Sequence, residues 1–333
     1  MTNASLSRLF LVFLAFVVIL YGAYVRLTDA GLGCPDWPGC YGQLLPANNL
    51  QFAHDSNFEQ SKLWIEMIHR YLAATLGLLI LLIAILIERN KSLTSAVKWL
   101  SRGILFLVII QALFGMLTVM MKLLPQVVSL HLLSGMLLLA LLFILLLNLS
   151  AHPRQPNLQQ LRPYALSVVI LLSCQIALGV WTSSNYAGMA CPDFPTCQNQ
   201  WLPQLTLSDS FNITAVSEQN YQGGSLAAQH RVTIQVVHRL VAILLIVSVL
   251  SLFYRLWQSQ LKVQASLLLG LTLLQISLGI ANAVLMLPLP LALAHNSGAA
   301  LLLLSAVYIN FLVMYQQSST LNQQHQYVRQ PIT

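Results

Sequence analysis

Charged residues are scarce in this 333-residue sequence: Lys and Arg number 16, Asp and Glu number 9, and together they form 8% of the chain. Hydrophobic residues form 57%, and the mean hydropathy is +0.72. A soluble globular domain of this composition would expose too much apolar surface to water, so that class is excluded. The lipid bilayer must be the main solvent of the chain.

The formal net charge of +7 does not indicate a nucleic-acid partner, because the basic residues gather in alternate short connections between apolar segments. By the positive-inside rule these connections are cytoplasmic. The long connections at residues 27–63 and 184–231 carry acidic residues with little basic charge, so they face the opposite, periplasmic side. Both termini are then cytoplasmic. The basic residues are Arg8, Arg89, Lys91, Lys98, Arg102, Arg154, Arg162, Arg255, Lys262 and Arg329.

Eight apolar segments are long enough to cross a hydrocarbon core of about 30 Å, which needs roughly 20 helical residues. The first segment resembles a signal peptide in its position, but its length and the lack of an A-x-A site after it favour a retained helix. We therefore expect a multi-pass protein of a bacterial inner membrane. The segments are residues 9–26, 64–87, 101–121, 127–150, 164–183, 232–254, 263–286 and 290–314.

The sequence contains an internal repeat. The run GCPDWPGC from Gly33 to Cys40 matches ACPDFPTC from Ala190 to Cys197. An even number of crossings per repeat keeps both halves in the same orientation, so a pseudo-two-fold axis should follow the membrane normal. We predict an all-α integral membrane protein whose eight helices form two four-helix bundles, at residues 1–150 and 151–333. Further matches are IEMIHR from Ile65 with IQVVHR from Ile234, and Gln111-x-x-x-Gly115 with Gln275-x-x-x-Gly279.

Four histidines occupy matching positions in the two halves: His69 and His131 in the first, His238 and His295 in the second. An ionisable group inside a membrane helix costs on the order of a few kcal/mol, which function or a buried partner usually explains. Two facing imidazoles in a four-helix bundle can hold a haem iron between them. Hydrogen-bonded interfacial histidines are the alternative. The repeat of all four positions favours two haem sites.

Arg70 and Arg239 each follow one of these histidines directly. A guanidinium near the membrane surface suits the carboxylates of haem propionates, whereas contact with lipid headgroups is the alternative role. The remaining histidines have no repeat partners and are expected to be solvated in loops or at the cytoplasmic side. They are His54, His152, His230 and His325.

Four of the five cysteines form two closely spaced pairs on the predicted periplasmic side, Cys34 with Cys40 and Cys191 with Cys197. Thiols are oxidised there, and the two prolines between each pair favour a turn, so we predict one local disulfide in each loop. A metal or redox role is the alternative. Cys174 stands alone in the fifth helix and is predicted to be a small apolar packing residue.

Glu66 breaks the symmetry of the repeat. It lies three residues before His69, on nearly the same helix face, and its counterpart in the second half is Gln235. A carboxylate beside a haem site can move protons or stabilise positive charge, and a glutamine can do neither. The alternative is a glutamate that faces water at the membrane surface.

These motifs resemble those of the haem A synthase family, which makes the haem of cytochrome oxidases. The resemblance is carried by GLGCPDWP from Gly31, EMIHR from Glu66, VHR from Val237 and HNSG from His295. It implies oxidation of the C8 methyl of haem O to a formyl group, with Glu66 needed for turnover. It also implies that His69 and His131 bind the haem O substrate, and that His238 and His295 hold a resident haem b.

The resemblance further implies an electron acceptor, which the sequence does not identify, and as partners haem O synthase and cytochrome oxidase assembly factors. Two other classes stay open. A diheme electron-transfer cytochrome b would need the same four histidines but not the difference between Glu66 and Gln235. A transporter with a duplicated bundle would be expected to have broken helices near the membrane midplane, whereas the polar groups here gather at one outer level.

Overall fold

A computed structural model describes residues 3–45, 59–150, 158–214, 216 and 220–327, with side chains described from residue 9 to residue 314. Within these ranges the regular structure is helical, apart from two isolated bridges in the cysteine loops. Eight helices are long and apolar enough to cross a membrane. The prediction of an all-α, eight-span membrane protein is therefore confirmed. His54 and His152 lie outside the described residues, as does the side chain of His325.

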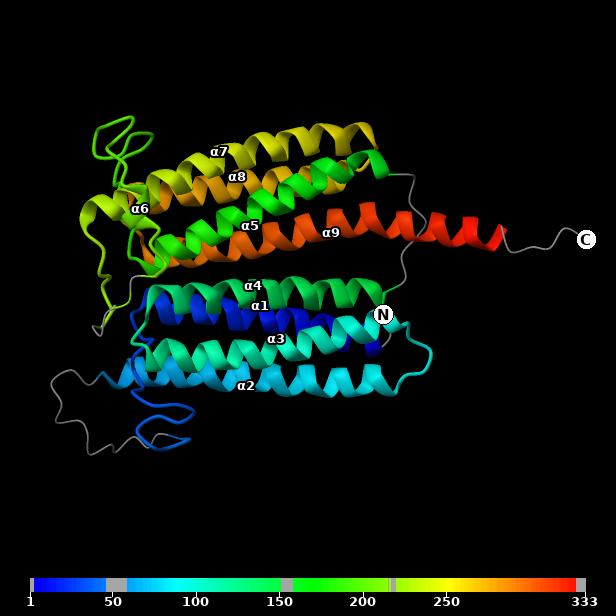
Figure 1. Cartoon of the computed structure of the whole chain (residues 1–333), viewed down its shortest axis with the longest axis horizontal. Helices are drawn as coiled ribbons and strands as arrows, with labels where there is room; N and C mark the ends of the chain where they lie inside the picture. Colours follow the sequence, from blue (N-terminus) through cyan, green and yellow to red (C-terminus); the bar gives the residue numbers. More distant parts are fainter. Residues whose placement is uncertain (1–2, 46–58, 151–157, 215, 217–219, 328–333) are drawn as a thin grey trace, which may run out of the picture.

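The membrane-crossing helices form two groups that lie side by side (Figure 1). Helices α1 and α4 of the first group contact α5 and α9 of the second. We call the end at which α2, α4, α7 and α9 begin the disulfide end, because both cysteine loops lie there. The first group is α1 (Asn3–Leu27), α2 (Gln60–Arg89), α3 (Ser95–Met120) and α4 (Pro125–Asn148); the second is α5 (Arg162–Ser184), α7 (Ala228–Gln258), α8 (Lys262–Val284) and α9 (Leu289–Tyr327).

Several helices are longer than the apolar segments that predict them. Helices α2 and α7 each begin four residues earlier than predicted, at Gln60 and Ala228. These added turns carry polar residues, so hydropathy cannot detect them, although the helix continues past the apolar run. The sequence also does not predict the short helix α6 (Leu207–Ser210) or the 3₁₀ turn η2 (Gln159–Leu161).

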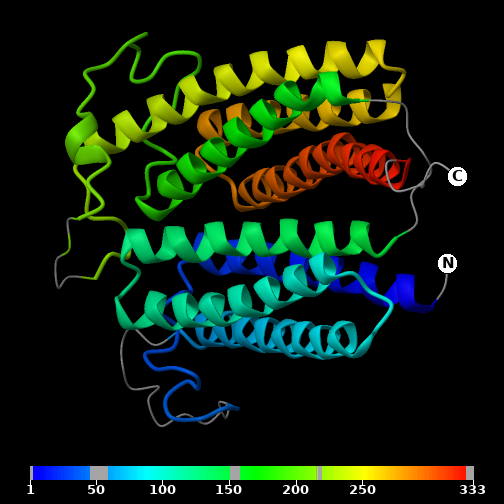
Figure 2. The ribbon, with the colours of Figure 1, turned by 45° about the vertical axis from the view of Figure 1, so that its right-hand side comes forward.

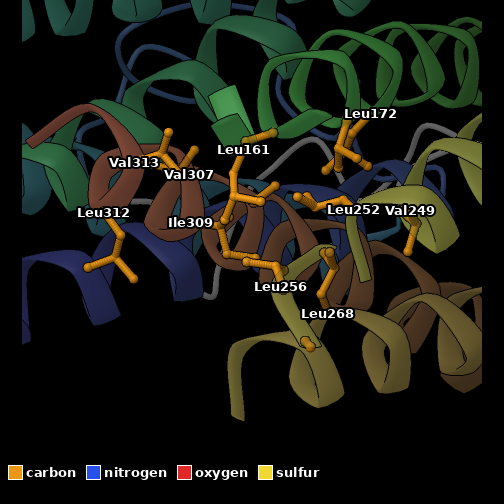
Figure 3. Packing of buried hydrophobic residues seen from close by; sticks show 14 of the residues in the cluster. Leu161, Leu172, Val249, Leu252, Leu256, Leu268, Val307, Ile309, Leu312 and Val313 are labelled. Carbon is orange, nitrogen blue, oxygen red and sulfur yellow. The ribbon is translucent and has the colours of Figure 1, made fainter. Parts of the chain in front are cut away.

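Apolar side chains fill the space between helices in both groups. The larger cluster joins α5, α7, α8 and α9, with Leu172, Leu252 and Leu268 fully or almost fully buried (Figure 3). Lipid tails are as apolar as leucine, so such packing stabilises the bundle mainly through close van der Waals contact. Other large apolar residues, such as Leu78 and Phe106, are exposed on the outside of the bundle, as lipid contact requires.

Cys174 does not have the packing role that the sequence predicts. Its thiol is free and exposed on α5. Leu172, two residues earlier, belongs to the buried core, and two residues correspond to about 200° of helix rotation. Cys174 therefore faces the lipid, and the prediction of a packing residue is wrong.

Polar contacts join the two groups near the disulfide end. A guanidinium N–H of Arg26, in the last turn of α1, donates to the carbonyl of Ser183 in α5 at 2.5 Å. The hydroxyls of Ser129 in α4 and Ser184 in α5 lie 3.0 Å apart. Inside a membrane, hydrogen bonds between helices strengthen association because no water competes for the same groups. These contacts fix how the two halves meet.

Candidate functional site

The structure brings the four repeat-matched histidines together in two pairs. His69 in α2 lies close enough to His131 in α4, and His238 in α7 to His295 in α9, for a charge on one ring to act on the other. The Nδ1 atoms of His69, His131 and His295 are buried without a hydrogen-bond partner among the described residues. Each half therefore contains one pair of imidazoles, and three of the four rings have an Nδ1 atom that no described residue binds.

A glycine on a neighbouring helix lies against each of the four rings. A Cβ at any of these glycines would lie 3.0–3.3 Å from the Cε1 atom of the histidine, closer than an ordinary contact. The glycines therefore leave room for the rings in the positions that they occupy, and any larger residue would displace them. The pairs are Gly22 with His69, Gly115 with His131, Gly179 with His238, and Gly279 with His295.

A glutamine on the third helix of each half binds the backbone of the fourth helix at its histidine. The amide nitrogens of Gln111 and Gln275 donate to the backbone carbonyls of His131 and His295, both at 3.0 Å. The oxygen of Gln111 also accepts from the hydroxyl of Ser134. The second half has Gly298 at that position, and the Gln275 oxygen is buried without a partner.

The surroundings of the first histidine differ between the halves. The ring of His238 has the amide nitrogen of Gln175 at 3.1 and 3.3 Å from its two nitrogens, so the amide lies against the ring. The repeat counterpart of Gln175 is the apolar Val18. His69 instead has the ring of Tyr21 nearly parallel to its own, with centroids 6.3 Å apart. The two sites are therefore not chemically equivalent.

Both cysteine pairs form disulfides, Cys34–Cys40 and Cys191–Cys197. An aspartate inside each loop organises the turn. In the second loop, Asp193 accepts from the backbone N–H groups of Gln198 and Asn199 at 2.7 and 2.9 Å. The hydroxyl of Thr196 also donates to this carboxylate, and these hydrogen bonds lower the pKa of Asp193 to about 2. In the first loop, Asp36 binds the N–H groups of Tyr41 and Gly42 in the same way.

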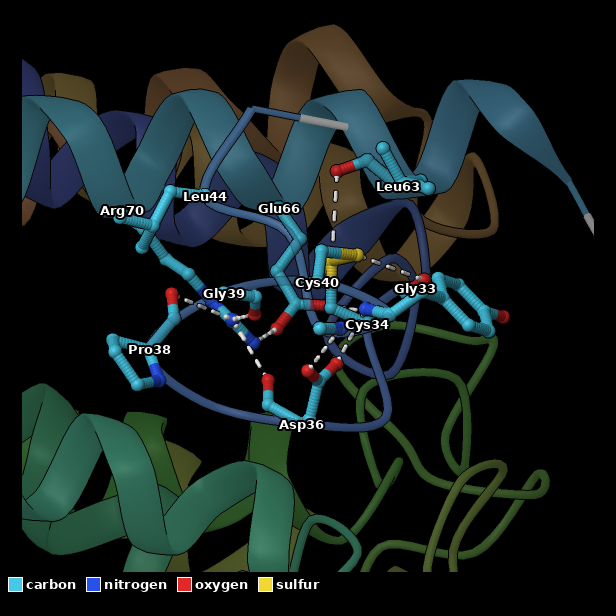
Figure 4. The surroundings of a disulfide bond; sticks show 12 residues. Gly33, Cys34, Asp36, Pro38, Gly39, Cys40, Leu44, Leu63, Glu66 and Arg70 are labelled. Carbon is cyan, nitrogen blue, oxygen red and sulfur yellow. Dashed lines mark hydrogen bonds and ion pairs between the residues drawn. A yellow bond between two sulfur atoms is a disulfide. The ribbon is translucent and has the colours of Figure 1, made fainter. Parts of the chain in front are cut away.

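Arg70 and Arg239 tie these loops to the helices. Arg70 donates to the carbonyls of Asp36 at 2.8 Å and of Gly39 (Figure 4). Arg239 donates to the carbonyls of Cys191 and Thr196 at 2.9 and 2.7 Å. The sequence predicts contacts of these arginines with haem propionates or with lipid headgroups, but not these bonds to the loops. The loop carbonyls lie more than 30 residues away along the chain, so no local pattern indicates the contact.

Glu66 is buried, with 4% of its surface exposed. One carboxylate oxygen accepts from the backbone N–H of Cys34 at 2.8 Å, and the other pairs with Arg70 at 2.5 Å (Figure 4). The alternative of a glutamate that faces water is therefore wrong. Gln235, the counterpart of Glu66, is also buried, but its side-chain oxygen has no partner. The charged pair exists only beside the first histidine site.

His230 also differs from its expected solvated loop position. It lies in the first turn of α7, is half-buried, and its Nδ1 is 2.9 Å from the hydroxyl of Thr206. It lies eight residues before His238 on the same helix, and its hydrogen bond ties the connection before α7 to the first turn of that helix. His230 is therefore a structural residue of this corner.

The paired imidazoles fit a haem with two axial histidines. Each pair supplies two imidazoles, and the glycines beside them leave room for the rings where they lie. Among the described residues, no three His, Cys, Asp or Glu side chains gather as they would around a bare metal ion. The donor set of two histidines per half thus suits a cofactor that brings its own equatorial ligands.

The helices define a multi-pass membrane protein, and its paired histidines would suit a haem inside each bundle. Comparison with known proteins makes the assignment specific. The model of the COX15-CtaA family, described as cytochrome oxidase assembly protein, matches residues 7–307. The chain belongs to this family.

Individual relatives agree with this assignment. The chain is 46% identical to "Heme A synthase" of Shewanella oneidensis over 328 residues, which cover 95% of this chain and 98% of that protein. It is 24% identical to "Heme A synthase" of Rhizorhabdus wittichii over 334 residues, with 92% and 93% covered. A third protein of that name, from Halalkalibacterium halodurans, is 28% identical over 197 residues, 57% of this chain and 62% of that protein.

Proposed function

We propose that this chain is a haem A synthase, an oxidoreductase that converts the C8 methyl of haem O to a formyl group for cytochrome oxidase assembly. The observation that carries the proposal is the buried Glu66–Arg70 pair, which lies beside the histidine site of the first half and has no charged counterpart in the second. The high identity over nearly the whole chain to a protein named heme A synthase supports the same conclusion.

The difference between the halves supports an assignment of the two haems. His238 and His295, in the bundle of residues 151–333, would hold a resident haem b, and His69 and His131, in the bundle of residues 1–150, would bind haem O. A haem with two histidine ligands supplies reversible one-electron chemistry. The amide of Gln175 against the His238 ring suits a permanently held cofactor, because it restricts the orientation of that ligand.

Glu66 would accept or hold a proton at the first site. Oxidation of a methyl group removes electrons and protons, and a nearby carboxylate can receive a proton or stabilise developing positive charge. The hydrogen bond from Cys34 and the ion pair with Arg70 keep the carboxylate in one place. Gln235 has the same size and similar burial but cannot take this role.

Arg70 and Arg239 would bind haem propionates in addition to the loop carbonyls. A guanidinium has more N–H donors than the loop bonds use, and its planar fork matches a carboxylate. Both arginines follow an axial histidine directly in the sequence, so their backbones lie at the edge of each haem site. One residue type would then hold both the loop and the cofactor.

The charge distribution supports a bacterial inner membrane with both termini in the cytoplasm and both disulfide loops in the periplasm. Arg89, Lys91, Lys98 and Arg102 lie at the end opposite the disulfides, as the positive-inside rule requires. Disulfides persist in the periplasm. The partners would be haem O synthase, oxidase assembly factors and an electron acceptor, at the inner membrane or on its periplasmic side.

Pigment analysis of the purified protein tests the function. The protein would be isolated from cells that also make haem O, and its haems would be extracted and separated by chromatography. The proposal predicts haem b together with haem O and haem A. Two equivalent molecules of haem b would instead indicate a diheme electron-transfer cytochrome, and protein without haem would favour a transporter.

A further inference from the structure

The two disulfide loops expose large apolar side chains at matching positions of the repeat. Each loop presents an aromatic residue between its cysteines and two adjacent apolar residues shortly after the second cysteine. All six are too exposed to belong to a folded core. They are Trp37 (43% exposed), Leu44 (68%) and Leu45 (75%) in the first loop, and Phe194 (50%), Trp201 (80%) and Leu202 (73%) in the second.

Hydrogen bonds within each loop occupy some of its polar groups at the same time. In the second loop the Asp193 carboxylate binds backbone N–H groups of the turn, and Arg239 binds two loop carbonyls. The disulfide closes the turn between them. The loop is therefore a tied structure that exposes large apolar side chains next to polar ones such as those of Gln198 and Asn199, which is unusual for a loop surrounded by water.

The loops lie beside the bundle rather than over its end. Figures 1 and 2 show the first loop at one edge of the molecule, next to the start of α2, and the second at the opposite edge, next to α7. The phenol of Tyr71, eleven residues into α2, donates to the carbonyl of Leu44 at 2.6 Å. The loop thus reaches back along the side of the helix.

The height of the loops corresponds to the edge of the hydrocarbon core. Arg70 lies 19 residues before Arg89, the last residue of α2, and Arg239 lies 19 residues before the end of α7 at Gln258. At 1.5 Å per residue this is about 29 Å, close to the thickness of a bilayer core. Since both arginines bind their loops, the loops lie where the headgroups begin.

The apolar surface of the loops continues into the lipid-facing surface of the helices. Ile68 on α2 and Leu240 on α7 are exposed next to the loop-binding arginines, and exposed apolar residues follow along both helices. Both helices are long and apolar enough to cross a membrane, where lipid would cover their exposed apolar faces. Tryptophan and leucine at the end of such a surface are typical of side chains that enter the headgroup region.

We propose that the two disulfide loops are lateral membrane anchors, whose apolar tips Trp37, Leu44 and Leu45, and Phe194, Trp201 and Leu202, insert into the leaflet at the disulfide end. The disulfide and the arginine hold each tip at the level of the neighbouring histidine site. The anchors lie at opposite edges of the molecule and therefore also limit its tilt in the bilayer.

Fluorescence quenching of Trp201 tests this proposal. The protein and a Trp201→Phe variant would be reconstituted in phosphatidylcholine vesicles, and the difference between their emission spectra gives the signal of Trp201. We expect lipid brominated close to the headgroup to quench this signal several-fold more than lipid brominated near the chain end, and aqueous iodide to quench it weakly. Strong quenching by iodide without quenching by brominated lipid would overturn the proposal, and would favour a surface that docks another protein.

A second pair of variants separates insertion from loop folding. Leu202→Asp places a charge in the apolar tip, and Asn199→Asp places the same charge at an exposed polar position of the same loop. Leu202→Asp should abolish the lipid quenching of Trp201 and shift its emission to the red, while Asn199→Asp should leave both unchanged. Mass spectrometry of the unreduced Cys191–Cys197 peptide confirms that the loop is intact. Equal behaviour of the two variants would contradict the anchor.

Discussion

The phenol of Tyr186 donates a 2.7 Å hydrogen bond to the carboxylate of Asp29, and these two residues are counterparts in the repeat. Each lies five residues before the first cysteine of its loop. Counterparts related by a two-fold axis can touch only where that axis passes between them, so this bond marks the axis at the disulfide end. Arg26 stacks on the Tyr186 ring at 3.9 Å and completes a polar joint between the halves.

Removal of this hydrogen bond should weaken the joint. We expect Tyr186→Phe to lower the free energy of unfolding by about 1 kcal/mol, the usual contribution of one hydrogen bond, because the ring and its contact with Arg26 remain. Thermal unfolding of the purified protein in detergent measures the effect. Asp29→Ala, which removes the acceptor, and the double variant complete a cycle, in which the two single losses should not add. Additive losses would mean that the two side chains do not interact.

The turn that follows Cys191 should open in acid. The pKa of Asp193 is lowered from 3.8 to about 2, so its stabilising hydrogen bonds are fully present above pH 3.8 and are lost as the pH falls through about 2. Amide exchange at Gln198 and Asn199, corrected for the intrinsic rate, should accelerate across this window. Asp193→Asn should show no such pH dependence. A variant that kept the wild-type profile would show that another group controls the turn.

The glycine beside His238 should be essential for the haem site of the second half. Gly179→Val places side-chain atoms where a Cβ alone would be 3.3 Å from the ring, so the imidazole must move and haem b should be largely lost. Gly270→Val is the matched control, because no atom lies within 4 Å of its Cβ position. The ratio of haem to purified protein, from the pyridine haemochrome spectrum, distinguishes them. Equal haem content in both variants would refute the steric role of Gly179.

The axial ligands of the second half can be tested separately. His238→Ala or His295→Ala should remove the low-spin spectrum of haem b, because a single imidazole cannot maintain coordination by two histidines. Optical spectra of the reduced and oxidised protein provide the measurement. Should either variant retain the wild-type spectrum and haem content, that histidine is not a ligand of the resident haem.

The sequence predicts those features of the fold that depend on local composition. Apolar segments of sufficient length locate the eight membrane helices, and the repeat of cysteines, histidines and arginines locates the matching positions of the two halves. The exposure of Cys174 could not be predicted, because composition does not tell which face of a helix meets lipid. Helix ends are also missed where polar turns continue beyond the membrane.

The contacts of the site depend on helix packing, which the sequence does not specify directly. Nothing local marks Gly22 and Gly179 as neighbours of histidines that lie 47 and 59 residues further on. The repeat does contain a signal, since each lies twelve residues before the first cysteine of its loop. The bonds from Arg70 and Glu66 to the cysteine loop had no such signal, because backbone groups are their partners.

Haem analysis of two opposite substitutions tests the central claim that Glu66 serves the reaction. Glu66→Gln and Gln235→Glu would each be expressed beside a source of haem O, and the extracted haems would be separated by chromatography. We predict that Glu66→Gln keeps the haem b spectrum and the Cys34–Cys40 disulfide but loses most haem A, with haem O accumulating, because the amide cannot accept a proton. Gln235→Glu should leave haem A formation nearly unchanged. Near-normal haem A from Glu66→Gln would contradict the account and leave Glu66 as a link between α2 and its loop.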